Sequence, residues 1–96
     1  LDVEAVMGAV RASGARVVHP GYGFLSERSV FARALEQAGV AFCGPRADTM
    51  DAMGGKISAK EIAERAGVPT LPWARVEEGG DLRAAAKRVG FPLLLK

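Results

Sequence analysis

The sequence has very little of several features that would point directly to a function. It contains one cysteine and one histidine among 96 residues, so no internal disulfide can form and zinc-ligand spacing is missing. Its formal net charge is only +2, and the basic residues are scattered, which argues against nucleic-acid and membrane-surface binding. No run of about 18 apolar residues is present to cross a bilayer. These shortages predict a protein of a reducing cytoplasm with neither a nucleic acid nor a membrane as partner.

What is present is the composition of a folded globular protein. Hydrophobic residues make up 49% of the chain and charged residues 25%, which argues against disorder. At this length the chain forms at most one small domain or a piece of a larger one. It ends in the apolar run FPLLLK at residues 91–96, and we therefore expect a fragment that stops within a strand.

The first 45 residues alternate between helical spacing and short β-branched or apolar runs. The spacing of Val3, Val6, Met7 and Val10 predicts an amphipathic helix with these residues on its apolar face, closed by Gly14. A second helix is predicted from Ser26 to Gly39. Short strands are predicted at residues 17–18 and 40–43, and the apolar neighbours of Cys43 predict a buried thiol. Helix and strand in strict alternation with short connections predict a parallel α/β arrangement.

The later residues follow a different pattern. A short helix is predicted over residues 47–53, and the Ser-x-x-Glu sequence at residues 58–61 has the form of a capping box opening a further helix, which Gly67 is expected to close. Prolines make residues 68–72 extended. A last short helix is predicted over residues 82–89, followed by the final apolar strand.

The loop at residues 19–27, HPGYGFLSE, follows the first strand, where ligands commonly sit in open α/β sheets. Gly21 and Gly23 bracket Tyr22 and allow backbone conformations closed to other residues. Two interpretations stay open at this point: a loop that presents its aromatic rings to a ligand, or a tight Pro-Gly turn with Tyr22 and Phe24 tucked into the core.

Two lysines are candidates for binding phosphate. Lys56 follows a glycine pair just before a predicted helix, and Lys96 ends an apolar strand, so either ammonium could reach phosphate oxygens; the alternative is that both are ordinary surface lysines. A P-loop is excluded, because Met50 occupies the place of its first glycine. His19 is a candidate base or metal ligand, but because no second histidine or cysteine lies near it, a structural role at the strand end is expected instead. Glu27 is a candidate general acid, with interaction with a helix dipole as the alternative.

Several motifs together resemble the biotin carboxylase component of biotin-dependent carboxylases. They occur in the same order as in that family: HPGYGFLSE at 19–27, FCGP at 42–45, MGGKISA at 53–59, AGVP at 66–69 and GFPLLLK at 90–96. The resemblance implies an α/β fold: the later half of a Rossmann-like (pre-ATP-grasp) parallel-sheet domain over residues 1–45, a helical linker over 46–69, and the start of the ATP-grasp domain over 70–96.

The resemblance also implies a function. Biotin carboxylases use ATP and Mg²⁺ (or Mn²⁺) to activate bicarbonate as carboxyphosphate and then carboxylate biotin on a carrier protein. Lys56 and Lys96 fall on the two lysines that hold ATP phosphates. His19, Tyr22, Gly23 and Glu27 fall on the loop that borders the biotin and bicarbonate pocket.

The fragment has no catalytic or metal-binding residue of the family, since those lie beyond Lys96, and it is expected to be inactive alone. The family usually has an aspartate where this chain has Gly55, which removes an acid beside Lys56. Expected partners are the biotin carboxyl carrier, a carboxyltransferase and a second copy of the full-length parent, in the cytoplasm or the mitochondrial matrix. The alternatives are another ATP-grasp ligase of the carbamoyl-phosphate synthase type, or a non-catalytic interaction module.

Overall fold

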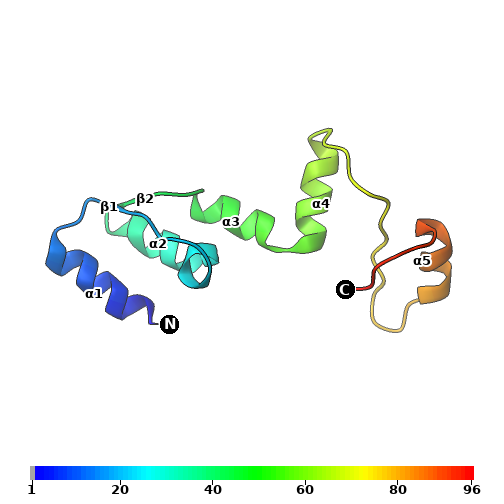
Figure 1. Ribbon diagram of the computed structural model, residues 1–96, viewed down its shortest axis with the longest axis horizontal. Coiled ribbons are helices and arrows are strands. Elements are labelled where there is room, and N and C mark those ends of the chain that lie inside the picture. The colour runs from blue at the N-terminus through cyan, green and yellow to red at the C-terminus, as the bar shows by residue number, and fades with distance from the viewer. Residues whose placement is uncertain (1) are drawn as a thin grey trace. The chain divides into compact units, whose positions relative to one another are not determined.

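The computed structural model describes residues 2–96, which form two compact units, residues 2–59 and residues 60–96. The elements are coloured along the chain in Figure 1. Their bounds are α1 Val3–Ser13, β1 Val17–Val18, the 3₁₀ turn η1 Phe24–Glu27, α2 Ser29–Gln37, β2 Ala41–Phe42, α3 Ala47–Gly54, α4 Lys56–Arg65 and α5 Leu82–Val89.

The first unit confirms the predicted alternation of helix and parallel strand. Strands β1 and β2 pair in parallel, with Val17 opposite Ala41 and Val18 opposite Phe42. The ladder continues past both strands, because the Ala41 amide donates to the Arg16 carbonyl (3.0 Å) and the Cys43 amide donates to Val18 (2.8 Å). The Cys43 side chain itself is exposed, so the prediction of a buried thiol was wrong.

The core of the first unit lies between α1 and α2 and reaches β2. Met7 and Val10 come from the predicted apolar face of α1, and Phe31 and Leu35 come from α2. The Phe31 ring meets the edge of Phe42, with ring centroids 6.1 Å apart and perpendicular planes, an arrangement that aromatic pairs favour. These contacts fix the start of α2 and therefore the end of the loop that precedes it.

Two helix boundaries differ from the sequence prediction. Ser26 does not open α2, because its hydroxyl donates to the Gly23 carbonyl (2.7 Å) within the 3₁₀ turn, and α2 begins three residues later at Ser29. Ser58 does not open α4 either, because that helix begins at Lys56 and the Ser58 hydroxyl donates to the Gly55 carbonyl (3.0 Å). In both cases the serine side chain satisfies a local carbonyl rather than capping the helix predicted to start there.

The second unit contains the end of α4, an extended stretch and α5. Helix α4 ends at Arg65, and Gly67, which the sequence predicts to close it, follows in the left-handed region (φ 74°). Helix α5 is capped by Asp81, whose carboxylate accepts a hydrogen bond from the Ala84 amide (2.9 Å). After α5 the chain is extended over residues 91–96, but the structure assigns no strand there, so the predicted final strand is not formed within the described residues. The Phe91–Pro92 peptide bond is cis.

Candidate functional site

The loop at residues 19–27 leaves the carboxyl end of β1 and is fixed by its own hydrogen bonds. The His19 Nδ1 atom accepts a hydrogen bond from the Gly21 amide (3.1 Å). Gly21 and Gly23 have φ values of 70° and 69°, in the left-handed region that favours glycine. His19 therefore contacts the backbone of its own loop, and the backbone on both sides of Tyr22 depends on glycine.

The loop displays its aromatic rings instead of burying them. Tyr22 is 96% exposed and Phe24 is 80% exposed, so the alternative in which both rings enter the core was wrong. Phe24 also has φ 51°, a left-handed conformation that costs a non-glycine residue on the order of 1–3 kcal/mol and is found most often at functional sites. A strained, exposed aromatic between two hydrogen-bonded turns is typical of a surface that contacts a ligand.

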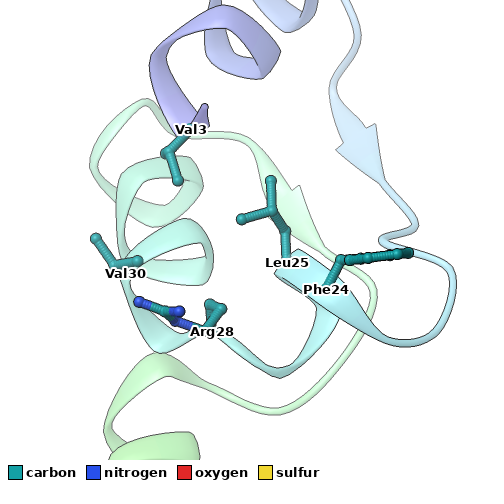
Figure 2. A pocket seen from close by; sticks show the side chains of 5 residues that line it. All are labelled: Val3, Phe24, Leu25, Arg28 and Val30. Atoms are coloured by element: carbon teal, nitrogen blue, oxygen red, sulfur yellow. The ribbon is translucent and has the colours of Figure 1, made fainter. Parts of the chain in front are cut away.

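A shallow hollow of about 290 Å³ lies beside this loop, at the start of α1 and α2. It is lined by Val3, Phe24, Leu25, Arg28 and Val30, and Figure 2 shows Leu25 directed toward Val3 while the Phe24 ring points away along the loop. Arg28 adds a cation that the sequence analysis did not select, although its position directly after Ser-Glu in the loop motif was visible. Of the predicted loop residues, His19, Tyr22, Gly23 and Glu27 do not line this hollow.

Lys56 is the first residue of α4 and its side chain is exposed. A helix N-terminus carries partial positive charge from its free amides, so an ammonium placed there adds to a local potential that favours anions. No hydrogen bond or ion pair joins the Lys56 ammonium to another group among residues 2–96. The ammonium is therefore available to a ligand.

The Gly55 backbone does not itself require glycine. Its φ and ψ are −87° and 132°, an extended conformation open to any residue. A Cβ atom built at Gly55 would lie 2.6 Å from the Ser58 hydroxyl oxygen. The Ser58 side chain can rotate away, so an aspartate fits here at the cost of its hydrogen bond to the Gly55 carbonyl.

Lys96 belongs to the second unit and is also exposed. It follows Leu94 and Leu95, which are 77% and 65% exposed. Within that unit, a hollow of about 430 Å³ lies between α5 and the extended run; it is lined by Leu82, Arg83, Ala86, Phe91, Leu93 and Leu95. Lys56 therefore belongs to the first unit and Lys96 to the second.

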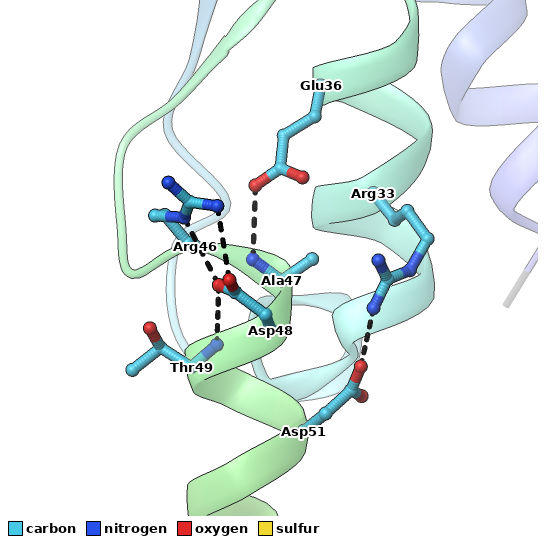
Figure 3. A network of polar contacts seen from close by, with 7 residues as sticks. All are labelled: Arg33, Glu36, Arg46, Ala47, Asp48, Thr49 and Asp51. Atoms are coloured by element: carbon cyan, nitrogen blue, oxygen red, sulfur yellow. Dashed lines mark hydrogen bonds and ion pairs between the residues drawn. The ribbon is translucent and has the colours of Figure 1, made fainter.

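A polar network joins α2 to α3, the helix that leads to Lys56 (Figure 3). The Glu36 carboxylate accepts a hydrogen bond from the Ala47 amide (3.1 Å) at the start of α3. Arg33 pairs with Asp51 across the same two helices. Arg46, the residue before α3, makes no side-chain cap. The Glu36 carboxylate caps the helix instead. Sequence reasoning missed this cap, because its two partners lie eleven positions apart.

The same network shifts the pKa values of Arg46 and Asp48 at its exposed end. Hydrogen bonds from the Arg46 guanidinium and then from the Thr49 amide hold the pKa of Asp48 below its usual range. The pKa of Arg46 is raised in turn by its hydrogen bond to Asp48 and by the charges of Asp48 and Glu36. Both groups are therefore charged at neutral pH, and α3 begins with an acid where the helix dipole favours one.

Within residues 2–96, no cluster of three or more histidine, cysteine or acidic side chains is arranged to hold a metal ion. None of the described helices combines the length and apolar character needed to cross a bilayer.

A sequence model described as the N-terminal domain of biotin carboxylase matches residues 1–50. The chain belongs to the biotin carboxylase N-terminal domain family. Relatives include the propionyl-CoA carboxylase alpha chain of Ruegeria pomeroyi, which is 46% identical over 98% of this chain, and the biotin carboxylase of Pseudomonas aeruginosa, 41% identical over 100% of it. The chain spans 14% and 22% of the lengths of these two relatives.

Solved biotin carboxylase domains share the fold. The domain of Hydrogenobacter thermophilus 2-oxoglutarate carboxylase, solved as a dimer with MgADP, ADP and bicarbonate, is 40% identical and superposes with a TM-score of 0.81. That match covers 94% of this chain and 20% of the solved one. The resemblance drawn from the motifs is thereby confirmed, as is an α/β fold with a small parallel sheet like that of biotin carboxylase domains.

Proposed function

We propose that this chain serves a biotin carboxylase: it helps to bind ATP and to border the pocket where bicarbonate and carrier-bound biotin react. The observation that carries the proposal is the family match together with an exposed loop, because the nine-residue motif at residues 19–27 displays its rings to solvent. The family match favours this function over a carbamoyl-phosphate synthase type of ligase. The chain would act within a longer protein of the Rossmann-like and ATP-grasp architecture.

The charges of the two lysines fit a triphosphate. Both ammonium groups are exposed, and neither forms an ion pair within the described residues, so neither is already neutralised by a carboxylate. When ATP binds, it supplies a phosphoryl group that activates bicarbonate for attack by biotin. Lys56 and Lys96 would hold the phosphates and stabilise the negative charge that accumulates during transfer.

The loop would supply the other side of the pocket. Tyr22 offers a flat ring with a polar hydroxyl, suited to contact with the planar ureido ring of biotin. Gly23, which has no side chain, lets a reactant approach the backbone closely. His19 and Glu27 would hold the loop in place, His19 through the hydrogen bond to the Gly21 amide. The described residues offer no magnesium cluster, so Mg²⁺ would be bound by other parts of the protein.

The test is the ATP dependence of bicarbonate-dependent, biotin-stimulated ATP cleavage by the complete protein. Lys96→Gln is expected to raise the KM for ATP about tenfold or more, since a lost charged contact of about 1.4 kcal/mol corresponds to one decade. The matched control is Lys87→Gln, which removes an exposed lysine of α5 and should leave the KM unchanged. Equal KM values for the Lys96 variant and the native protein would remove Lys96 from the ATP site.

The loop is tested separately from the lysines. Tyr22→Ala is expected to lower biotin-dependent turnover more than it weakens ATP binding, and Tyr22→Phe should recover most of the turnover if the ring is the contact. The reverse order, with ATP affinity affected first, would contradict the assignment of Tyr22 to the biotin side. A protein with no ATP cleavage under any of these conditions would support a non-catalytic interaction module.

A further inference from the structure

A carboxylate near the end of α4 binds the extended segment that follows it. Oxygen Oε1 of Glu64 accepts a hydrogen bond from the Thr70 hydroxyl and another from the Trp73 indole Nε1, each 2.7 Å long. Both donors belong to residues 68–74, which we call the strap. Glu64 thus joins two points of the strap to one point of the helix.

The backbone brings the strap back along α4 before these bonds form. The Gly67 amide donates to the Glu64 carbonyl (3.0 Å), and the Val68 amide donates to Ala63 (2.9 Å). With Gly67 in the left-handed region (φ 74°), this is a Schellman reversal, which turns the chain back at the end of a helix. Pro69 and Pro72 then restrict the strap further, since each proline fixes its own φ.

The Trp73 side chain has a second contact on the same helix. The Lys60 ammonium lies 6.0 Å from the centroid of the indole ring, at the outer limit of a cation–π contact. Lys60 precedes Glu64 by one helical turn, so the indole meets a cation at its face and a carboxylate at its N–H group. Half-buried Trp73 is therefore oriented by two groups of α4.

The Glu64 carboxylate is charged at neutral pH. Hydrogen bonds from Thr70 and Trp73, and then the charge of Lys60, lower the pKa of Glu64. Hydrogen bonds to an ionised acceptor are shorter and stronger than neutral ones. The Glu64 bonds therefore supply an attachment that the Schellman reversal and the prolines do not, because those restrict the backbone without fixing the indole.

We propose that Glu64 is a positioning residue, which clasps the strap to the end of α4 within the second unit and so fixes the start of the segment that leads to Lys96. Lys56 begins the helix that carries Glu64, and the strap is the segment through which the chain leaves that helix toward Lys96. The effect on ATP rests on the proposed function. A clasped strap reduces the ordering that ATP binding at Lys96 requires, because part of the segment that leads to Lys96 is already fixed.

The clasp is tested first by a signal from Trp73 that does not depend on catalysis. The complete protein is labelled with 5-fluorotryptophan, and the ¹⁹F resonance that disappears in Trp73→Phe is assigned to Trp73. Glu64→Ala should shift and sharpen that resonance, because the indole loses its acceptor. Glu64→Gln should move the resonance back toward the native position, since an amide oxygen can accept the same two hydrogen bonds, though more weakly than a carboxylate.

The matched control is Glu61→Ala. Glu61 lies one turn earlier on α4 and is exposed, and its carboxylate makes no hydrogen bond within residues 2–96. This change removes an acid of the same helix and should leave the ¹⁹F resonance unmoved. Thr70→Val removes one of the two bonds and should give a smaller shift than Glu64→Ala. A Trp73 resonance that is identical in Glu64→Ala and the native protein overturns the clasp.

The positioning role is tested by separating KM from kcat. Glu64→Ala should raise the KM for ATP about three- to tenfold and leave kcat within about twofold, the pattern of a lost uniform contribution to binding. Glu64→Gln should lower the KM again, to a value between those of Glu64→Ala and the native protein. The double variant Glu64→Ala with Trp73→Phe should be no worse than Glu64→Ala alone, because both changes remove the same contact.

The outcomes separate this inference from the proposed function. A shifted Trp73 resonance with an unchanged KM, while Lys96→Gln still raises the KM, overturns the positioning role and leaves ATP binding in place. An unchanged KM in both Lys56→Gln and Lys96→Gln overturns the proposed ATP site itself, whatever the resonance does. If Glu64→Ala does not fold, Thr70→Val decides the matter by the same two measurements, with a smaller shift and a smaller rise in KM.

Discussion

Removing the Glu36 carboxylate should destabilise α3 by an amount that the structure allows to be estimated. Helix α3 begins at Ala47, whose amide donates to Glu36, while the preceding Arg46 supplies no side-chain cap. Losing a side-chain cap costs about 0.5–2 kcal/mol. With a urea dependence of about 1–3 kcal/mol per molar, a loss of about 1 kcal/mol lowers the unfolding midpoint by roughly 0.3–1 M. Glu36→Ala should therefore shift the urea midpoint within that range.

A second variant divides this cost into its hydrogen-bond and charge parts. Glu36→Gln keeps an oxygen that can accept from the Ala47 amide but loses the negative charge near the helix N-terminus, a part worth about 0.3–1 kcal/mol. In low salt, the urea midpoint of Glu36→Gln should lie between the midpoints of Glu36→Ala and the native protein. Near 1 M salt, where the Debye length is about 3 Å, it should approach the native midpoint. Glu36→Ala should stay destabilised at both salt concentrations.

The assay combines urea unfolding with hydrogen exchange at the Ala47 amide. Exchange at this single site should be faster in Glu36→Ala than in the native protein, because its acceptor is gone. The matched control is Gln37→Ala, which changes the next exposed side chain of α2 without touching α3. Native midpoints and native Ala47 exchange in Glu36→Ala would refute the cap.

Three further predictions concern the first unit. Leu35→Ala should cost about 2–5 kcal/mol, because Leu35 is fully buried, whereas Val30→Ala, at a 51% exposed position of the same helix, should cost far less; urea midpoints compare the two. Gly55→Asp should raise the melting temperature slightly, since aspartate is a better N-cap than glycine by a few tenths of a kcal/mol, provided that the Ser58 hydroxyl rotates away; a lower melting temperature would show that it does not. Asp48 has a lowered pKa in the folded state, so its contribution is complete above its unfolded pKa of about 3.9 and is lost as the pH falls through the folded value. The difference in midpoint between the native protein and Asp48→Asn should therefore shrink on acidification below pH about 4, and a difference independent of pH would contradict this.

Local patterns were sufficient to predict most of the secondary structure. The spacing of Val3, Val6, Met7 and Val10 predicted α1 and the residues it buries, and left-handed Gly14, Gly39 and Gly67 end or follow the helices they were expected to close. The parallel pairing of β1 with β2 followed from the order of the elements. The helices and their ends depend on residues within one or two turns of each other, and the strand pairing depends on the order of the elements, so a local reading of the sequence was enough for both.

The wrong predictions have two causes: a local pattern that allows two hydrogen bonds for one side chain, and a position whose surroundings are set by residues distant in the sequence. Ser26 and Ser58 look like helix caps in a four-residue window, but each hydroxyl finds a nearer carbonyl in the folded chain. The Cys43 side chain, in an apolar run, was placed inside although it lies on the exposed side. A strand at residues 91–95 needs a neighbouring strand, and the described residues supply none.

The sequence predicted part of the candidate site. The exposed loop around Tyr22 was one of two readings of its glycines, and the structure selects it. The roles of Lys56 and Lys96 came from motif resemblance and remain predictions. Glu36 and Glu64 were missed, because their bonds to Ala47 and Trp73 join positions eleven and nine residues apart. Contacts at these separations produce no helical or strand periodicity in the sequence.

The exposed thiol of Cys43 offers a practical route to the solution behaviour of the protein. It is the single cysteine of the 96 residues, and its amide is hydrogen-bonded to Val18. A nitroxide attached to Cys43 would therefore be held by an ordered backbone. With a second nitroxide on Lys87→Cys of α5, pulsed electron spin resonance would measure the distance between the two units, with and without nucleotide.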